Sequence, residues 1–156
     1  MMPFLLLLAP FLLAVIAAAA SGVIFPAAGP WYQSLNAPSF QPPNWLFGPV
    51  WTVLYLMIAV CGARLAVQAG QGAGLAGFAL GLWALQITLN ALWTPTFFGA
   101  HALGAALVII GALWLSIAAL MATALQIDRL AGWLLAPYLG WVSFAAVLNW
   151  AFWRLN

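Results

Sequence analysis

Five long apolar runs dominate this sequence, and each is long enough to cross a lipid bilayer as a helix. They cover roughly residues 3–25, 45–68, 75–98, 102–126 and 130–153, and a spanning helix needs ~20 mostly apolar residues. Inside lipid, only a helix or a closed barrel satisfies the hydrogen bonds of the backbone, and the runs lack the alternation of barrel strands. The sequence therefore predicts an all-α integral membrane protein, a bundle of five transmembrane helices in one domain over residues 1–156.

Charged residues make up only 3% of the chain, whereas 68% is hydrophobic. A soluble domain carries about 25% charged residues, so the solvent of this chain is lipid. The charged residues are Arg64, Asp128, Arg129 and Arg154, which form no basic patch for nucleic acid. Cys61 is the single cysteine and excludes both an internal disulfide and a cysteine metal site.

The first run has an alternative interpretation, because the small residues in "AAAASG" resemble a signal-peptide cleavage site. No Lys or Arg precedes the run, however, and it is longer than a usual signal core, so we interpret it as a span. Arg64 and Arg129 fall on one side of the membrane and Arg154 on the other. This distribution does not fix the orientation by the positive-inside rule.

The third run carries polar and aromatic side chains along one face of its predicted helix. The spacings of +3, +4 and +3 between Trp83, Gln86, Asn90 and Trp93 form a single stripe. Unpaired amides are costly in hydrocarbon, so we expect this stripe to face the bundle interior. There the amides could bond neighbouring helices or meet the polar edge of a ligand, and the spacing leaves both open.

A second stripe on the same run consists of small residues and faces the opposite way. Its members are Gly77, Gly81, Ala84 and Thr88. Gly77-x-x-x-Gly81 lets another helix approach closely. That helix could belong to the same bundle or to a second copy of the chain, and the pattern does not decide between them.

Two further runs combine large rings at helical spacing. Tyr138, Trp141, Ala145 and Asn149 form one stripe of the fifth run, bordered by Leu148, and Trp51 and Tyr55 lie one turn apart in the second. Aromatic walls with a few polar groups suit a flat, largely apolar ligand. We therefore interpret these residues as the lining of a cavity.

Conventional catalysis has no basis in this residue inventory. Asp128 is the only carboxylate side chain, so no acid–base pair can form. We interpret Asp128 and Arg129 as a loop ion pair at the start of the fifth span. His101 is the only histidine, and its place in a tight turn favours a solvated residue over a metal or haem ligand. The sequence predicts a binding protein without a metal site or a required cofactor.

Three segments together resemble the TspO/MBR family of translocator and tryptophan-rich sensory proteins, in its bacterial type. They are "WYQSLNAPSFQPPNWLFGPVWTVLY", "LQITLNALWTPTFF" and "DRLAGWLLAPYLGWVSFAAVLNWAFWRLN". The specific features are Trp-Tyr before a Pro-x-x-x-Pro-Pro loop, Trp-Thr-x-x-Tyr, Gln-x-x-x-Asn-x-x-Trp and Pro-Tyr-x-x-Trp. The resemblance covers essentially the whole chain.

The resemblance implies a homodimer of five-helix bundles, each with a pocket that binds porphyrins and haem-like tetrapyrroles under a lid loop, residues 26–44. The ligand-binding residues would be Gly22, Tyr32, Pro42, Pro43, Trp51, Tyr55, Gln86, Asn90, Trp93, Tyr138, Trp141, Ala145 and Leu148. The dimer contact would be the small stripe of Gly77, Gly81, Ala84 and Thr88. The prolines of the lid would lower the entropy cost of closing it.

The resemblance implies a tetrapyrrole sensor, regulator or carrier, and two alternatives remain open. One is a transporter of tetrapyrroles or other small hydrophobic ligands, although the sequence shows no inverted repeat or ion-coupling residue. The other is light-dependent breakdown of protoporphyrin, with the ligand as photosensitiser. Trp150 stands where the tyrosine of a sterol motif is expected, which leaves sterol binding doubtful.

Overall fold

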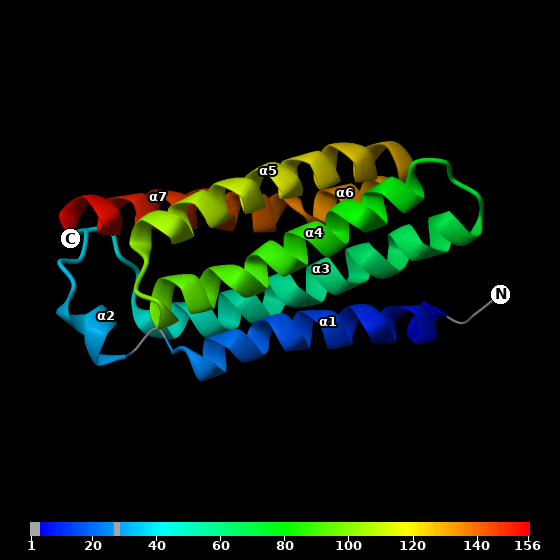
Figure 1. The fold of residues 1–156 in the computed structure, drawn as a ribbon. Coiled ribbons are helices and arrows are strands. Elements are labelled where there is room, and N and C mark those ends of the chain that lie inside the picture. Colours follow the sequence, from blue (N-terminus) through cyan, green and yellow to red (C-terminus); the bar gives the residue numbers. More distant parts are fainter. Residues whose placement is uncertain (1–3, 27–28) are drawn as a thin grey trace.

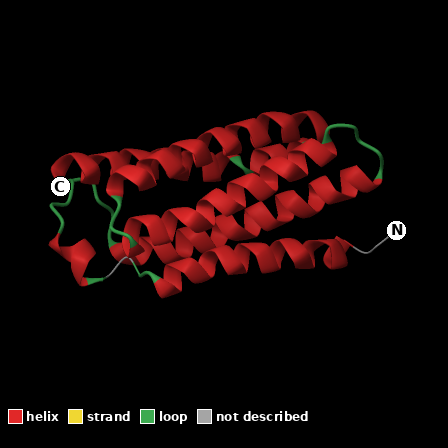
Figure 2. Ribbon diagram, in the orientation of Figure 1, coloured by secondary structure: helices red, strands yellow, loops and turns green. Residues whose placement is uncertain are grey.

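The structure, a computed structural model, describes residues 4–26 and 29–156, and the elements in those ranges are all helical (Figures 1 and 2). Five helical segments of this part of the chain are long and apolar enough to span a membrane. They are Phe4–Ile24, Asn44–Gly70, Ala76–Gly99, Leu103–Ile127 and Arg129–Leu155. The predicted all-α membrane bundle of five spans is confirmed.

The helices run up and down the bundle, and the start of the first long helix and the end of the last one lie at opposite ends of it (Figure 1). The long elements are α1 (Phe4–Ile24), α3 (Phe47–Gly70), α4 (Ala76–Thr94), α5 (Leu103–Ile127) and α7 (Ala136–Leu155). The most extensive contacts join α4 to α5, α1 to α3 and α5 to α7. Helix α1 is peripheral, because Val15 and Ala18 are its only buried residues among those described.

Four short elements lie between the long helices, and prolines mark two of the breaks. Pro95 opens the π-helical turn η2 (Pro95–Gly99) at the end of α4, and Pro137 lies in the first turn of α7, after α6 (Arg129–Leu134). Proline lacks the N–H that a continuing helix needs. The predicted lid loop contains the short helix α2 (Pro30–Ser34) and leads into the 3₁₀ turn η1 (Asn44–Leu46); its residues 27 and 28 lie outside the described residues.

The polar stripe of α4 faces the interior of the bundle, because unpaired polar groups facing hydrocarbon would be costly. Trp83, Gln86 and Asn90 are all buried, and the Nε1 of Trp83 donates a hydrogen bond to the carbonyl oxygen of Ile58 at 2.9 Å. A Cβ at Gly62 would overlap the rings of Phe11 and Trp83. Glycine at this position therefore allows α1, α3 and α4 to pack closely.

The ion pair of Asp128 differs from the sequence-based expectation, since its partner is Arg64 and not Arg129. A carboxylate oxygen of Asp128 lies 2.8 Å from Nη2 of Arg64, and Oδ1 accepts hydrogen bonds from the backbone N–H of Leu130 and Ala131. Burial alone would raise the pKa of Asp128, but these N–H groups and the guanidinium lower it overall. Asp128 caps α6, and that geometry turns its carboxylate toward α3, a contact that neighbouring positions in sequence could not reveal.

Candidate functional site

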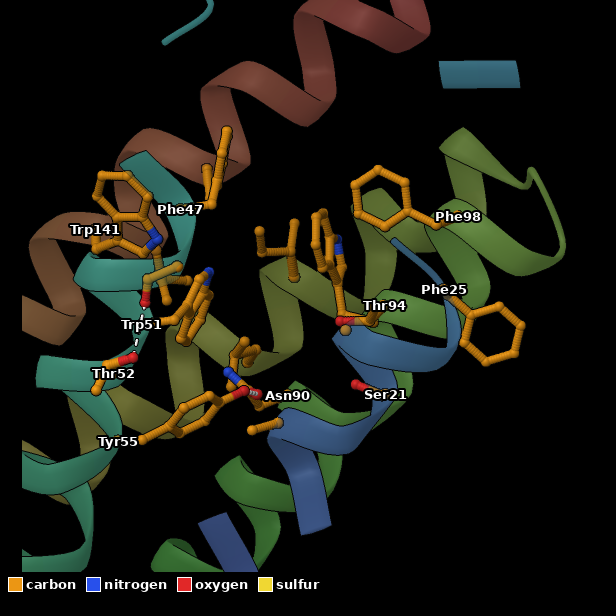
Figure 3. Close-up of a pocket in the computed structure, with 18 of the residues that line it drawn as sticks. Ser21, Phe25, Phe47, Trp51, Thr52, Tyr55, Asn90, Thr94, Phe98 and Trp141 are labelled. Atoms are coloured by element: carbon orange, nitrogen blue, oxygen red, sulfur yellow. Dashed lines mark hydrogen bonds between the residues drawn. The ribbon is translucent and has the colours of Figure 1, made fainter. Parts of the chain in front are cut away.

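A cavity of about 390 Å³ lies between α1, α3, α4, α5 and α7 (Figure 3). It sits where the carboxyl-terminal part of α1 faces the first turns of α3. The lining residues are Ala19, Ser21, Gly22, Val23, Phe25, Phe47, Gly48, Trp51, Thr52, Tyr55, Asn90, Trp93, Thr94, Phe98, Ile110, Leu113, Trp141, Val142 and Ala145. This set contains no charged residue, so the cavity is neutral.

Aromatic rings form much of the wall of the cavity. Trp51 and Tyr55 follow one another on α3 with ring centroids 5.2 Å apart, and the rings of Phe47 and Trp141 lie 5.9 Å apart. Figure 3 shows Trp51 and Trp141 on the side formed by α3 and α7, with Asn90 reaching the same cavity from α4. Trp51, Asn90 and Trp141 therefore converge on one space, as the sequence stripes predicted.

A chain of hydrogen bonds runs from the cavity into the bundle. The hydroxyl of Tyr55 donates to Oδ1 of Asn90 at 2.8 Å, and Nδ2 of Asn90 donates to the hydroxyl of Tyr138 at 3.1 Å. That hydroxyl donates in turn to Oε1 of Gln86 at 2.9 Å. Tyr138 and Gln86 are 0% exposed and do not line the cavity. They lie behind the lining residues and position Asn90 through hydrogen bonds. Direct contact of Tyr138 or Gln86 with a ligand stays a prediction.

The indole N–H of Trp141 is a buried polar group of a wall residue that makes no hydrogen bond. Its Nε1 is buried and has no hydrogen-bond partner in the described structure. Trp93 is held differently, because its Nε1 donates to Oδ1 of Asn149 at 3.0 Å, and Nδ2 of Asn149 donates to the carbonyl oxygen of Leu103. A buried donor without a partner is costly, and an acceptor atom that reached the Trp141 N–H would remove that cost.

A second cavity of about 30 Å³ adjoins the first under the α2 segment, residues 29–46. The two share Phe47, Trp93, Phe98 and Ala145 in their walls, and the second adds Tyr32 and Leu148. Burial raises the pKa of the Tyr32 hydroxyl to about 12. Tyr32 and Leu148 thus lie next to the main cavity and do not line it.

The prolines expected in the lid lie further away. Pro42 is half-buried and Pro43 is exposed, and neither lines the main cavity or the second one. Their contribution to ligand binding stays a prediction.

Of the predicted ligand-binding residues, seven line the main cavity: Gly22, Trp51, Tyr55, Asn90, Trp93, Trp141 and Ala145. Sequence patterns did not indicate most of the α1 wall, the α5 wall formed by Ile110 and Leu113, or Phe47. Phe47 could have been found, because Phe47, Trp51 and Tyr55 are spaced +4 and +4. Ile110 and Leu113 gave no sequence signal, since they are apolar like most of α5.

The small-residue stripe of α4 points away from the bundle. Gly77, Gly81, Ala84 and Thr88 are exposed, and a Cβ at either glycine would meet no atom within 4 Å. This placement excludes close packing of the stripe against another helix of the same bundle. The stripe therefore remains open to a second copy of the chain, and the dimer stays a prediction.

No group of three or more His, Cys, Asp or Glu residues in the described part of the chain could hold a metal ion. Fold and cavity together define a multi-pass α-helical membrane protein that encloses a neutral, aromatic cavity.

A model of the TspO/MBR family matches residues 7–154, and the chain belongs to this family. It is 42% identical to Protein CrtK of Rhodobacter capsulatus over 97% of this chain and 94% of that protein. It is 40% identical to the tryptophan-rich sensory protein of Cereibacter sphaeroides, over 81% of this chain and 77% of that one. Identity to the human translocator protein is 39%, over 81% of this chain and 75% of the relative.

Proposed function

We propose that this protein binds porphyrin- or haem-type tetrapyrroles inside the membrane and acts as their sensor, regulator or carrier. The observation that carries this proposal is the neutral cavity with Trp51, Trp93 and Trp141 in its walls. Relatives are named tryptophan-rich sensory protein and translocator protein, which fits a role in sensing or carrying a ligand.

Ring faces and neutral walls favour a flat conjugated ligand. Aromatic pairs stack or meet edge to face with centroids 4.5–7 Å apart, and a tetrapyrrole offers a larger face than any side chain. A charged or strongly polar molecule would lose its hydration on entry without a compensating charge. The unpaired N–H of Trp141 would bind an acceptor on the rim of the ligand.

The residues around the cavity support recognition of the ring over ligation of a metal. Histidine, cysteine and methionine are common axial ligands of haem iron, and none of them lines the cavity. Tyrosine can also serve, but the hydroxyl of Tyr55, the tyrosine of the wall, is engaged with Asn90. We therefore expect metal-free protoporphyrin and its iron complex to bind with affinities within about threefold of each other, a difference of roughly 0.65 kcal/mol.

The direct test is a titration of the purified protein in detergent with protoporphyrin, followed by quenching of tryptophan fluorescence. Trp51→Ala and Trp141→Ala should each weaken binding roughly tenfold or more, because they truncate large aromatic contacts at the centre of the site. Trp133→Ala is the matched control, since Trp133 is 62% exposed and does not line the cavity. Unchanged affinity in both cavity variants, with helical content intact, would contradict the proposed site.

A transporter is the second candidate, favoured by the name translocator protein of several relatives. Reconstituted liposomes with trapped porphyrin would then release it faster than liposomes that carry the Trp51→Ala and Trp141→Ala double variant. Binding in detergent without protein-dependent flux would favour the sensor.

A further inference from the structure

The side chain of His101 stacks on Trp31 across two segments that are distant in sequence. The ring centroids lie 4.0 Å apart and the planes differ by 12°. Trp31 belongs to α2, whereas His101 lies in the turn between η2 and α5. The stack joins α2 to the η2–α5 turn. It includes an imidazole, a side chain that can gain a proton near neutral pH.

The backbone at His101 is unusual for a residue with a side chain. Its φ is 57°, in the left-handed region that residues other than glycine occupy rarely and at a cost. Hydrogen bonds on both sides fix the turn, from Ala100 N to the Pro95 oxygen at 2.8 Å and from Ala102 N to the Thr96 oxygen at 3.1 Å. The turn therefore presents the imidazole to α2 in a defined direction.

The stack connects to the cavity through a series of aromatic contacts. Trp31 meets Phe97 with centroids 6.0 Å apart, and Phe97 meets Trp93 at 5.1 Å. Tyr32, the next residue of α2, meets Phe98 at 5.3 Å. Trp93 and Phe98 line the cavity, so the position of α2 determines how firmly that end of the cavity is packed.

We propose that His101 is a pH-sensitive latch for the α2 segment. Protonation turns the stacked imidazole into a cation over the face of an indole, the ring that attracts cations most strongly. The added attraction holds α2 against η2 at acidic pH. At alkaline pH the neutral stack is weaker, and α2 separates from the bundle more often.

Trp31 is the group that the protonated imidazole of His101 would contact. Tyr32 is the titratable group of α2, and Arg154 lies in the last turn of α7 near the same end of the bundle. Neither makes a hydrogen bond or ion pair with His101 within the described residues. η2, the last turns of α1 and the first turns of α5 contribute no charged side chain.

The latch can be measured without any ligand, so its failure is distinct from failure of the proposed function. A nitroxide attached to Ser34→Cys, on the exposed end of α2, reports the mobile fraction of α2 by EPR in untagged protein. Cys61 is 0% exposed, and labelled protein without the new cysteine gives the background. The ratio of mobile to immobile label should fall roughly two- to fivefold from pH 8 to pH 5.5, the range expected for an exposed cation–π contact.

Two variants at one position separate charge from structure. His101→Asn keeps a residue that tolerates the left-handed turn and removes the ring, so the label should be mobile at both pH values. His101→Arg places a permanent cation on Trp31 and should be immobile at both. Two results would overturn the proposal. One is a ratio of mobile to immobile label that does not change with pH in protein that keeps His101. The other is the same pH response in His101→Asn. Trp31→Leu checks the other side of the stack, because it should abolish the pH response while retaining apolar contact.

Discussion

Replacing Tyr138 with phenylalanine should weaken the bundle without reshaping the cavity. The Tyr138 hydroxyl accepts a hydrogen bond from Asn90 and donates one to Gln86, and the side chain is fully buried. Phenylalanine keeps the ring, so the packing behind the wall persists. The substitution leaves an amide N–H of Asn90 and an amide oxygen of Gln86 without their partner.

The expected cost follows from two limits. Hydrogen bonds between helices in membrane proteins contribute about 0.6 kcal/mol each on average, which sets a lower value near 1.2 kcal/mol for two. A buried polar group left without a partner costs about 1–3 kcal/mol. We expect a loss of about 1–3 kcal/mol in the free energy of unfolding, or roughly 2–12 °C in the unfolding temperature at about 2–4 °C per kcal/mol.

Thermal unfolding in detergent, followed by circular dichroism, measures this loss. Tyr32→Phe is the matched control, because the Tyr32 hydroxyl makes no hydrogen bond with the described residues, and its unfolding temperature should stay close to that of the unchanged chain. Protoporphyrin affinity of Tyr138→Phe should stay within about threefold, or roughly 0.65 kcal/mol. An unfolding temperature equal to that of the unchanged chain would refute the reasoning about the buried chain of hydrogen bonds.

Three further outcomes are expected. Gly77→Leu combined with Gly81→Leu should shift the detergent complex toward monomers in sedimentation, and an unchanged distribution would place any dimer contact elsewhere. The lowered pKa of Asp128 means that its stabilisation is present above the ordinary carboxyl pKa of about 3.9 and is lost as pH falls through the lower folded-state value. Asp128→Asn keeps a capping residue and should remove that acid-dependent loss from unfolding curves; a loss retained in the variant would assign it to another group. Gly62→Ala should destabilise the α1–α3 contact by about 1–3 kcal/mol, because the added methyl overlaps the Phe11 ring, and equal stability would show that the ring moves aside freely.

Sequence periodicity predicted the helices and the inward faces, because polar groups in hydrocarbon leave few choices. Gln86 and Asn90 had to find partners inside the bundle. Asn90 bonds Tyr55 and Tyr138, whereas Gln86 bonds Tyr138 through Oε1 and its Nε2 has no partner among the described residues. Which of them reaches the cavity depends on how α4 faces α7, a tertiary contact that spacing within one helix does not contain. The stripe of α4 therefore included Gln86, which lies behind the wall, together with Asn90, which lies on it. The stripe of α7 likewise included Tyr138, which lies behind the wall.

Sequence patterns did not predict the contacts between segments that are distant along the chain. The partner of Asp128 is on α3 because the cap of α6 turns the carboxylate in that direction, whereas adjacency had suggested Arg129. Ile110 and Leu113 carried no signal, since an apolar residue beside a cavity looks the same in sequence as one facing lipid.

The lack of charge around the cavity also decides how a ligand with acidic arms must sit. Its ionised carboxylates find no counter-ion among the rings and neutral groups of the wall, so they stay at the entrance, in water or among lipid headgroups, while the macrocycle enters apolar edge first. Affinity should consequently vary little with salt concentration, because no fixed charge of the wall is there for dissolved ions to screen.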